Sequence, residues 1–374
     1  MAQVTIRDLS RSKTVGAVGI ADVDFQKARR FAKILKDERA IPLRTDVRQV
    51  SRLSRQMQGW DVVINSTWYE FNLNVMSAAI RVGIHYLDLG GLYHMTLKQL
   101  KLDRRAKDAD VTCVLGMGST PGTMNVMAAQ AASLLDRVRT IRLRSGSAVV
   151  SPSETFQPPF SIRTILDEFT MPAIIFRSGK IVVVPAHGVL RSFFLPEPVG
   201  QVEGYFSIHS ELATLPFSLG KGLRNMDFTI AYPSDFSKLM LNLIQLGLVS
   251  KNTLDVRGAR IRPCDVLLSA VDELPAPAQV ELDVDIQRVE AYGVKDGKSA
   301  RITIDSISYP NRAHGLGGGA VGTGTPPSIV AQWLAEGRIK QKGTVPPECC
   351  IDPLPFFQEL RKRGIEIRRN TRIV

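Results

Sequence analysis

The segment DVVINSTWYEFNLNVMSAAIRVGIHYLDLGG, residues 61–91, decides the fold class because it alternates two periodicities. It opens with a short apolar strand, Asp61–Ser66, and residues 72–82 then have the apolar spacing of a helix. A second apolar strand, His85–Leu89, follows and leads into two glycines. Apolar strands separated by helices of about ten or more residues indicate a parallel sheet that is covered on both faces.

The same alternation extends over the first 120 residues. We expect helices at residues 4–9, 24–35, 47–57, 72–82 and 96–108, and strands at 15–22, 41–43, 61–66, 85–89 and 111–115. Asp24 is the expected N-cap of the second helix. The sequence therefore predicts a doubly wound α/β domain.

From about Thr123 the pattern changes to longer strands and proline-rich loops. A helix over 124–135 precedes strands at 138–145, 280–290 and 299–307, which indicates a separate α+β domain. Helices return at 328–335 and 355–363, before a short strand at 365–367. The glycine-rich run Gly315–Gly324 has no preceding strand and no lysine, so we expect a flexible loop there.

Length and composition narrow the class of protein. A chain of 374 residues suggests about two domains. With 44% hydrophobic and 22% charged residues, a mainly disordered or collagen-like chain is excluded. No apolar run approaches the ~18–20 residues of a membrane span, and the first residues do not resemble a signal peptide. The cysteines form no metal-binding spacing, which predicts no metal site and a cytoplasmic location (Cys113, Cys264, Cys349 and Cys350).

The net charge of +12 is concentrated at the two ends of the chain. Residues 1–60 carry 13 Lys/Arg against 6 Asp/Glu, and residues 338–374 carry 9 against 4, so the remainder is neutral. Such an excess suits a nucleic-acid surface, attraction of an anionic cofactor, or a basic solvated face. Residues 27–36 carry scattered basic residues with a single aromatic residue, Phe31, among them, which is weak support for nucleic-acid binding.

Asp22 lies at the end of a predicted strand that follows a helix. In a dinucleotide-binding fold, an acid at this point accepts hydrogen bonds from the adenosine ribose and repels a 2′-phosphate. The alternative is that Asp22 only ends the strand before a helix. In such a fold, a glycine loop before the first helix holds the pyrophosphate. The sequence begins at that helix and does not include the loop.

The segment Gly116-Met-Gly-Ser-Thr-Pro-Gly122 follows a strand and opens a helix. It differs from a phosphate loop, since Pro121 lacks one of the backbone N–H groups that such a loop uses. We interpret it as a strand-to-helix corner beside a site.

Together these motifs give the chain a family resemblance. It resembles the saccharopine dehydrogenase family over essentially its whole length, and it is most similar to the lysine 6-dehydrogenase branch. The resemblance is carried by Gly19–Asp24, Asp61–Asn72, Gly83–Gly91, Gly116–Gly122, Ile208–Pro216, Arg262–Leu268, Gly343–Glu348 and Arg363-Gly364.

The resemblance implies a split Rossmann-type dinucleotide domain, made of residues 1–122 and 325–374. Residues 123–324 would form the inserted α+β domain for substrate binding and dimerisation. The helix at 2–9 matches the family just after its glycine loop, so we expect roughly ten to twelve further residues, including the central first strand, before Met1.

The resemblance also implies cofactor contacts. Asp22 matches the ribose-binding acid of members that use NAD, so NAD is favoured over NADP. Asn65, Ser66 and Thr67 match positions that line the cofactor, and Gly90 and Gly91 lie at the following strand end.

Substrate and catalytic residues are implied in the same way. Tyr69 and Thr214 are candidates for substrate binding, and Asp88, His209 and Glu211 are candidates for proton transfer. The alternatives are that Tyr69 packs under its loop, that Asp88 forms a plain turn and that His209 is structural. Ala231 stands where the family usually has an arginine, so Arg224, seven residues earlier, is the candidate anchor for a substrate carboxylate.

The implied function is an NAD-dependent oxidation of the side-chain amine of L-lysine to the semialdehyde, with release of ammonia. One alternative is a saccharopine dehydrogenase or reductase, and another is an inactive or regulatory member without the phosphate loop. The expected partners are a small amino-acid substrate and a second copy of the chain, with neither a membrane nor nucleic acid.

Overall fold

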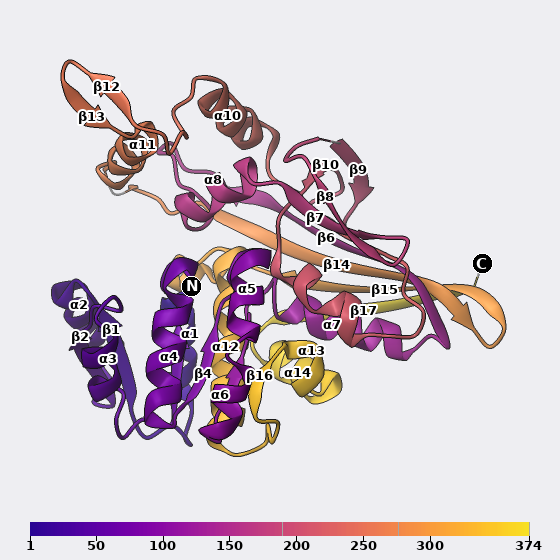
Figure 1. Cartoon of the computed structure of the whole chain (residues 1–374), viewed down its shortest axis with the longest axis horizontal. Helices are drawn as coiled ribbons and strands as arrows, with labels where there is room; N and C mark the ends of the chain where they lie inside the picture. The colour runs from indigo at the N-terminus through magenta and orange to yellow at the C-terminus, as the bar shows by residue number, and fades with distance from the viewer. Residues whose placement is uncertain (189, 276, 374) are drawn as a thin grey trace.

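The computed structural model describes residues 1–188, 190–275 and 277–373 (Figure 1). Helices and parallel strands alternate in the first part of the chain, as the sequence predicts. The elements are α1 (Ala2–Arg11), β1 (Val18–Asp22), α2 (Phe25–Leu35), β2 (Ala40–Arg44), α3 (Val50–Gln56), β3 (Val62–Asn65), η1 (Tyr69–Phe71), α4 (Asn72–Val82), β4 (His85–Asp88), α5 (Leu92–Leu100), α6 (Asp103–Asp108) and β5 (Thr112–Val114).

Two parallel sheets form this part. One has the order β16-β5-β4-β3, with β16 (Gly343–Val345) contributed from near the end of the chain, and the other contains β1 and β2. Within the described residues, β1 and β3 do not pair with each other, so each has an unpaired edge.

The second part is built on a nine-stranded mixed sheet of order β17-β15-β14-β6-β11-β10-β9, in which β7 pairs with β11 and β8 pairs with β7. Its longest strands cross the molecule beside the parallel sheets (Figure 1). The strands are β6 (Arg137–Ser151), β7 (Ala173–Arg177), β8 (Lys180–Val184), β9 (Leu190–Phe194), β10 (Gln201–Phe206), β11 (Asn225–Ala231), β14 (Leu282–Lys295), β15 (Lys298–Ser308) and β17 (Ile365–Ile373).

Helices and short elements complete the second part. They are α7 (Thr123–Ser133), α8 (Ile162–Thr170), η2 (Ser210–Ala213), α9 (Leu215–Ser218), α10 (Ser234–Gln245), β12 (Leu254–Val256), β13 (Ala259–Ile261), α11 (Pro263–Asp272), η3 (Arg312–His314), α12 (Gly318–Ala335), α13 (Pro347–Cys350) and α14 (Pro353–Lys362). One hydrophobic core joins the parallel strands, α7, α12, α14 and the large sheet. The two parts of the molecule are therefore held together by shared apolar packing.

Helix α12 corrects the expected flexible loop at Gly315–Gly324, because the chain is helical from Gly318 onward. Its glycines allow close contact with neighbouring elements. A Cβ at Gly322 would lie 2.6 Å from Ser308 Oγ, and one at Gly324 would lie 2.5 Å from the Met1 carbonyl oxygen. Close packing thus offsets the helix-destabilising effect of glycine, which local sequence alone does not reveal.

Two further expectations need correction. The helix expected at 96–108 is two helices, α5 and α6, which are separated at Lys101 and Leu102. The final strand is longer than expected, because β17 continues to Ile373 and pairs with β15 along its whole length. Its exposed basic residues hide the alternation typical of a strand. The predicted domain boundaries stay a prediction, and α12 crosses the second of them.

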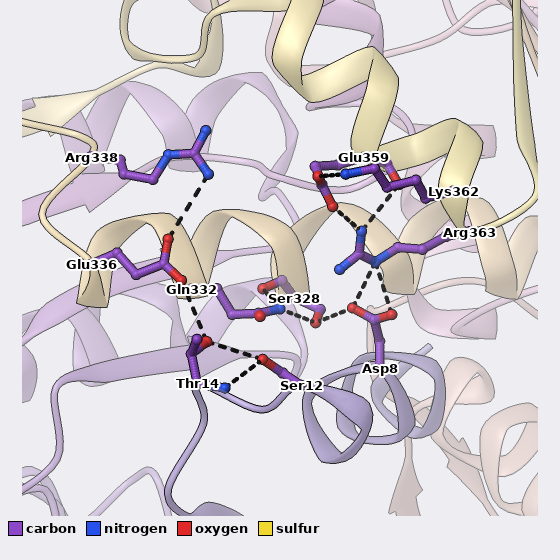
Figure 2. A network of polar contacts seen from close by, with 10 residues as sticks. All are labelled: Asp8, Ser12, Thr14, Ser328, Gln332, Glu336, Arg338, Glu359, Lys362 and Arg363. Atoms are coloured by element: carbon purple, nitrogen blue, oxygen red, sulfur yellow. Dashed lines mark hydrogen bonds and ion pairs between the residues drawn. The ribbon is translucent and has the colours of Figure 1, made fainter.

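A polar network joins the two basic ends of the chain (Figure 2). The Arg363 guanidinium donates to both oxygens of Asp8, at 2.8 and 2.9 Å, and Ser328 Oγ donates to Asp8 at 2.6 Å. Asp8 lies on α1, Ser328 on α12 and Arg363 just after α14. Both contacts come from Nε of Arg363, and a half-buried ion pair of this kind fixes geometry better than an exposed one.

Some global properties follow from the part of the chain that the structure describes. No helix there is long and apolar enough to cross a bilayer. No group of three or more His, Cys, Asp or Glu residues is arranged to hold a metal ion there. The four cysteines are free thiols. The cytoplasmic location stays a prediction.

Candidate functional site

The candidate site lies where the carboxyl ends of β3, β4 and β5 meet η2 and α8 of the second part. In open α/β sheets, ligands bind outside the carboxyl ends of the strands. Contacts between the parts occur here: the backbone N–H of Gly91 donates to Ser210 Oγ at 3.4 Å, and the Thr120 hydroxyl donates to Glu211. The tertiary structure thus brings together segments that are more than 90 residues apart.

Asp88 occupies the centre of the strand ends and is completely buried, at 0% exposure. One carboxylate oxygen accepts the backbone N–H groups of Gly90 and Gly116, both at 2.8 Å. The other accepts from Gln99 Nε2 at 2.6 Å and from the Tyr86 hydroxyl at 2.8 Å. Burial raises the pKa of Asp88, against the opposing effect of these four donors. Because each of its oxygens already accepts two hydrogen bonds, Asp88 is placed to fix the two loops rather than to contact a substrate.

Gly90 and Gly116 make that arrangement possible. Both have positive φ angles, 114° and 72°, and a Cβ on either would lie within 2.7 Å of the Pro121 ring. The Gly116–Gly122 segment forms the corner between β5 and α7, and its Gly118 N–H donates to the Pro121 carbonyl at 2.7 Å. Gly91 is buried against Asn72, so both glycines after β4 have packing constraints. Glycine is therefore required by the interlocked loops.

His209 and Glu211 form a buried pair at the junction of the two parts. His209 Nδ1 lies 2.5 Å from Glu211 Oε2, and the imidazole stacks on Phe228 with ring centroids 4.0 Å apart. Burial lowers the pKa of His209, but the charge and hydrogen bond of Glu211, helped by Glu168, raise it overall. The contact with Glu211 engages Nδ1, so Nε2 is the ring nitrogen that remains for a substrate. The geometry suits an oriented imidazole that exchanges a proton through Nε2.

Tyr69 crosses between the two parts. Its hydroxyl donates to Asp167 Oδ2 of α8 at 2.6 Å, and Lys251 Nζ binds the other oxygen of Asp167 at 2.7 Å. Burial, with this hydrogen bond, raises the pKa of Tyr69. Two neighbouring aromatic side chains, Trp68 and His94, each have a buried ring nitrogen without a partner in the described chain. Buried donors or acceptors without a partner fit a site that receives a polar ligand.

The expected cofactor positions lie at the same edge. Asp22 ends β1 and is half-buried, and its Oδ1 accepts the Asp24 N–H at 2.9 Å. Ser66 and Thr67 are exposed after β3, whereas Asn65 is buried and binds the Thr67 hydroxyl at 2.8 Å. A carboxylate and two hydroxyls at strand ends fit the ribose and amide groups of a dinucleotide. Asn65 is placed to shape the loop after β3 rather than to contact the cofactor directly.

Arg224 and Thr214 are not where the sequence suggested. Arg224 is exposed before β11, beside the β7–β8 turn at Gly179. Seven residues of extended chain separate it from Ala231, about 23 Å at 3.3 Å per residue, so it cannot replace an arginine there. Thr214 is buried beside Glu348 of α13, which also binds Asn125 at 2.8 Å. Thr214 therefore packs η2 onto α13.

Sequence reasoning missed two residues of the site, Glu168 and Tyr232. The Tyr232 hydroxyl donates to Glu168 Oε2 at 2.8 Å, and burial raises the pKa of Glu168 to about 7, with His209 and Tyr232 opposing that shift. Glu168 lies on an amphipathic helix and Tyr232 follows a strand, so neither forms a motif. Only the packing of α8 on β11 makes them neighbours.

The comparisons agree with this geometry. The family model described as "Saccharopine dehydrogenase NADP binding domain" matches residues 1–114, and "Saccharopine dehydrogenase C-terminal domain" matches residues 118–365. Carboxyaminopropylagmatine dehydrogenase of Synechocystis sp. is 25% identical over 342 residues, which cover 86% of this chain and 82% of that protein. Carboxynorspermidine synthase of Vibrio alginolyticus is 23% identical over 338 residues, 86% of this chain and 80% of that protein.

A solved structure, apo saccharopine dehydrogenase (L-Glu forming) from Saccharomyces cerevisiae, has the same fold. The TM-score is 0.77 at 18% identity, and the alignment covers 99% of this chain and 97% of that one. The chain is thus an oxidoreductase with a Rossmann-type domain that binds a nicotinamide dinucleotide. It belongs to the saccharopine dehydrogenase family.

Proposed function

We propose that this protein oxidises a carbon–nitrogen bond of a small amine with NAD, and that the side-chain amine of L-lysine is its substrate. The observation that carries the proposal is the buried His209–Glu211 pair, which faces the carboxyl ends of the parallel strands. An amine must lose its proton before it can give up hydride, and an oriented imidazole supplies the base.

The proposed steps use residues of this chain around the amine. Neutral His209 accepts a proton from the substrate ammonium at Nε2, and Glu211 stabilises the imidazolium that results. A bound nicotinamide ring supplies the hydride acceptor. The carbon that bears the amine, the ε-carbon of lysine, loses hydride and becomes an imine carbon. Water adds to that carbon, and ammonia leaves as the semialdehyde forms. Proton transfer of this kind contributes typically about 10²–10⁴-fold.

A second candidate substrate is an N-carboxyalkyl polyamine. Two relatives are named for such compounds, carboxyaminopropylagmatine and carboxynorspermidine. The site also contains three buried acids, Asp167, Glu168 and Glu211, although the whole chain has a net charge of +12. Acidic walls in a basic protein suit a substrate with more than one positive charge.

The substrate proposal is tested by NADH formation. The purified chain is incubated with NAD and L-lysine, saccharopine, or carboxynorspermidine, and absorbance of NADH is followed over time. We expect turnover with lysine in the absence of any keto acid. Turnover with carboxynorspermidine alone would show that the substrate is a polyamine derivative rather than lysine. Turnover with saccharopine alone would show that the assignment to the lysine 6-dehydrogenase branch is wrong.

The choice of cofactor rests on Asp22. Replacing Asp22 with alanine is expected to weaken NAD binding by about tenfold or more, because a hydrogen bond to a charged group is worth about 1.5–3 kcal/mol. NADP binding should change little or improve, since the variant lacks the charge that repels the 2′-phosphate. Titrations of protein fluorescence with NADH and NADPH measure both constants. Equal losses for the two cofactors would remove Asp22 from this role.

We also infer that two copies associate through the outward face of the large sheet. Cross-strand neighbours on that face alternate in charge: Arg142 lies opposite both Asp227 and Glu290, and Arg301 binds Glu290 at 3.5 Å. An alternating pattern is self-complementary under a two-fold axis. Light scattering at micromolar concentration tests this, and a monomeric mass contradicts it.

A further inference from the structure

A small cavity lies between α8, β10 and β11, and Glu168 is one of its lining residues. Its walls are almost all aromatic or acidic: Glu168, Phe169, His187, Tyr205, Phe206, Ser207, Ile230 and Tyr232. The cavity has a volume of about 10 Å³, enough for roughly one group of the size of water or ammonium.

The aromatic rings form a connected wall. Phe169 lies 4.6 Å from His187 and 5.3 Å from Tyr232 between ring centroids, and His187 lies 4.7 Å from Tyr205. Burial lowers the pKa of His187, so the imidazole adds no positive charge near neutral pH. Arg191 already covers Phe206 at 5.1 Å, and Phe169, Tyr205 and Tyr232 are the other aromatic carbon rings of the lining. Ring faces of this kind attract ammonium groups.

Two polar groups complete the cavity. Glu168 is buried and accepts one hydrogen bond, from the Tyr232 hydroxyl at 2.8 Å. Ser207 is 3% exposed, and its Oγ has no hydrogen-bond partner within the described residues. A buried hydroxyl without a partner is costly unless a ligand or water satisfies it. The carboxylate and the hydroxyl offer acceptors to the N–H groups of one ammonium.

We propose that this cavity is a subsite for a second, non-reacting ammonium group of the substrate, held by Glu168 and Ser207 within the aromatic wall. The inference rests on the proposed amine oxidation and favours its second candidate substrate, because it gives the substrate class as a diamine or polyamine. The subsite adjoins the proposed base, because Ser207 of the cavity lies two residues before His209, and His209 stacks on Phe228 of β11. The reacting amine then lies at His209 and the second one at Glu168.

Binding of 1,5-diaminopentane tests the subsite without turnover. Titration calorimetry at pH 7, in two buffers of different ionisation heat, measures both affinity and proton release. Because burial raises the pKa of Glu168 to about 7, about half of the molecules carry a proton there. A cation that requires the carboxylate should therefore release about half a proton. The other titratable groups around Glu168 are Asp167, Glu211, His209 and Tyr232, together with His187 and Tyr205 of the cavity wall.

Replacing Glu168 with glutamine should weaken diamine binding at least about tenfold and abolish proton release, because the charged acceptor is lost. Ser207→Ala should weaken binding by a smaller factor, and it keeps the hydrogen bond between Tyr232 and Glu168. Glu203→Gln is the matched control, since Glu203 lies exposed on β10 outside the cavity. Pentan-1-ol, a neutral probe of similar length, should not release protons from any variant.

Different outcomes separate the subsite from the proposed function. Unchanged diamine affinity in Glu168→Gln overturns the subsite, whether or not the enzyme oxidises amines. Diamine binding with proton release, but no NADH formation from any amine, overturns the proposed function and keeps the subsite. Loss of diamine binding in both Glu203→Gln and Glu168→Gln shows a nonspecific charge effect and also overturns the subsite.

Discussion

Replacing His209 with glutamine is expected to lower kcat for amine oxidation by about 10²–10⁴-fold, the usual contribution of a general base. Glutamine keeps a polar group near Glu211 but cannot take up a proton. The loss should appear in kcat more than in KM, because the proton moves only after the substrate is bound. Steady-state NADH formation by the variant and by His314→Gln, an exposed histidine outside the site, provides the comparison.

The pH profile gives a second readout for His209. Its pKa is raised above the usual 6.5, chiefly by Glu211 acting against burial. As a base His209 must be neutral, so wild-type oxidation should rise with pH through a value above 6.5, and the variant should lack that rise. A variant with the same profile and near-normal kcat would make another group the base.

The same raised pKa predicts an effect on stability. Because the folded protein holds the His209 proton more tightly than the unfolded chain, this group stabilises the fold fully below pH 6.5. That contribution is lost as the pH rises through the folded pKa. His209→Gln should flatten this part of the dependence of the unfolding free energy on pH. Urea unfolding of both proteins at a series of pH values measures it.

Replacing Asp88 with alanine is expected to lower the free energy of unfolding by about 3–5 kcal/mol. Four donors would lose their acceptor in a fully buried position: Gly90 N, Gly116 N, Gln99 Nε2 and the Tyr86 hydroxyl. Unsatisfied buried groups cost about 1–3 kcal/mol each, and neighbouring effects are not additive. Urea unfolding measures the loss, and Asp108→Ala, at an exposed site on α6, should stay within about 0.5 kcal/mol.

Asp88→Asn separates a structural role from a catalytic one. The amide keeps the shape and one acceptor oxygen, so the loss of stability should be smaller than for alanine. If Asp88 transferred the proton, this variant would lose at least about 10²-fold in kcat at nearly normal stability. We expect instead that Asp88→Asn measurably lowers the free energy of unfolding and changes kcat by much less than about 10²-fold.

Much of the fold was predictable because periodicity and capping are local. The strand Asp61–Ser66 and the helix 72–82 follow from apolar spacing, and the Asp24 side chain accepts the N–H groups of Gln26 and Lys27, as an N-cap does. The glycines of α12 show the limit of this approach. Their helical state depends on backbone contacts with Ser308 and Met1, which are distant in sequence.

The candidate site divides in the same way. Sequence alone placed Asp22, Ser66, Thr67, Asp88 and Gly90 at the ends of apolar strands, because parallel strands bring their carboxyl ends to one edge. Only the tertiary structure decided what each does there. Asp88 is buried and accepts four hydrogen bonds, and Arg224 lies at the end of β11 opposite Ala231. Burial and the direction of a strand are properties of the packed chain, so the sequence does not show them.

The sequence by itself determined the family, the parallel strands and the polar residues at their ends, because all of these are written in short-range patterns. The tertiary structure decided which acid lines the cavity and which histidine has an oriented partner. Glu168, Tyr232 and Ser207 come from three separate elements, and no spacing in the sequence connects them. Their chemistry exists only after α8 packs against β10 and β11, since burial creates both the raised pKa and the unpartnered hydroxyl.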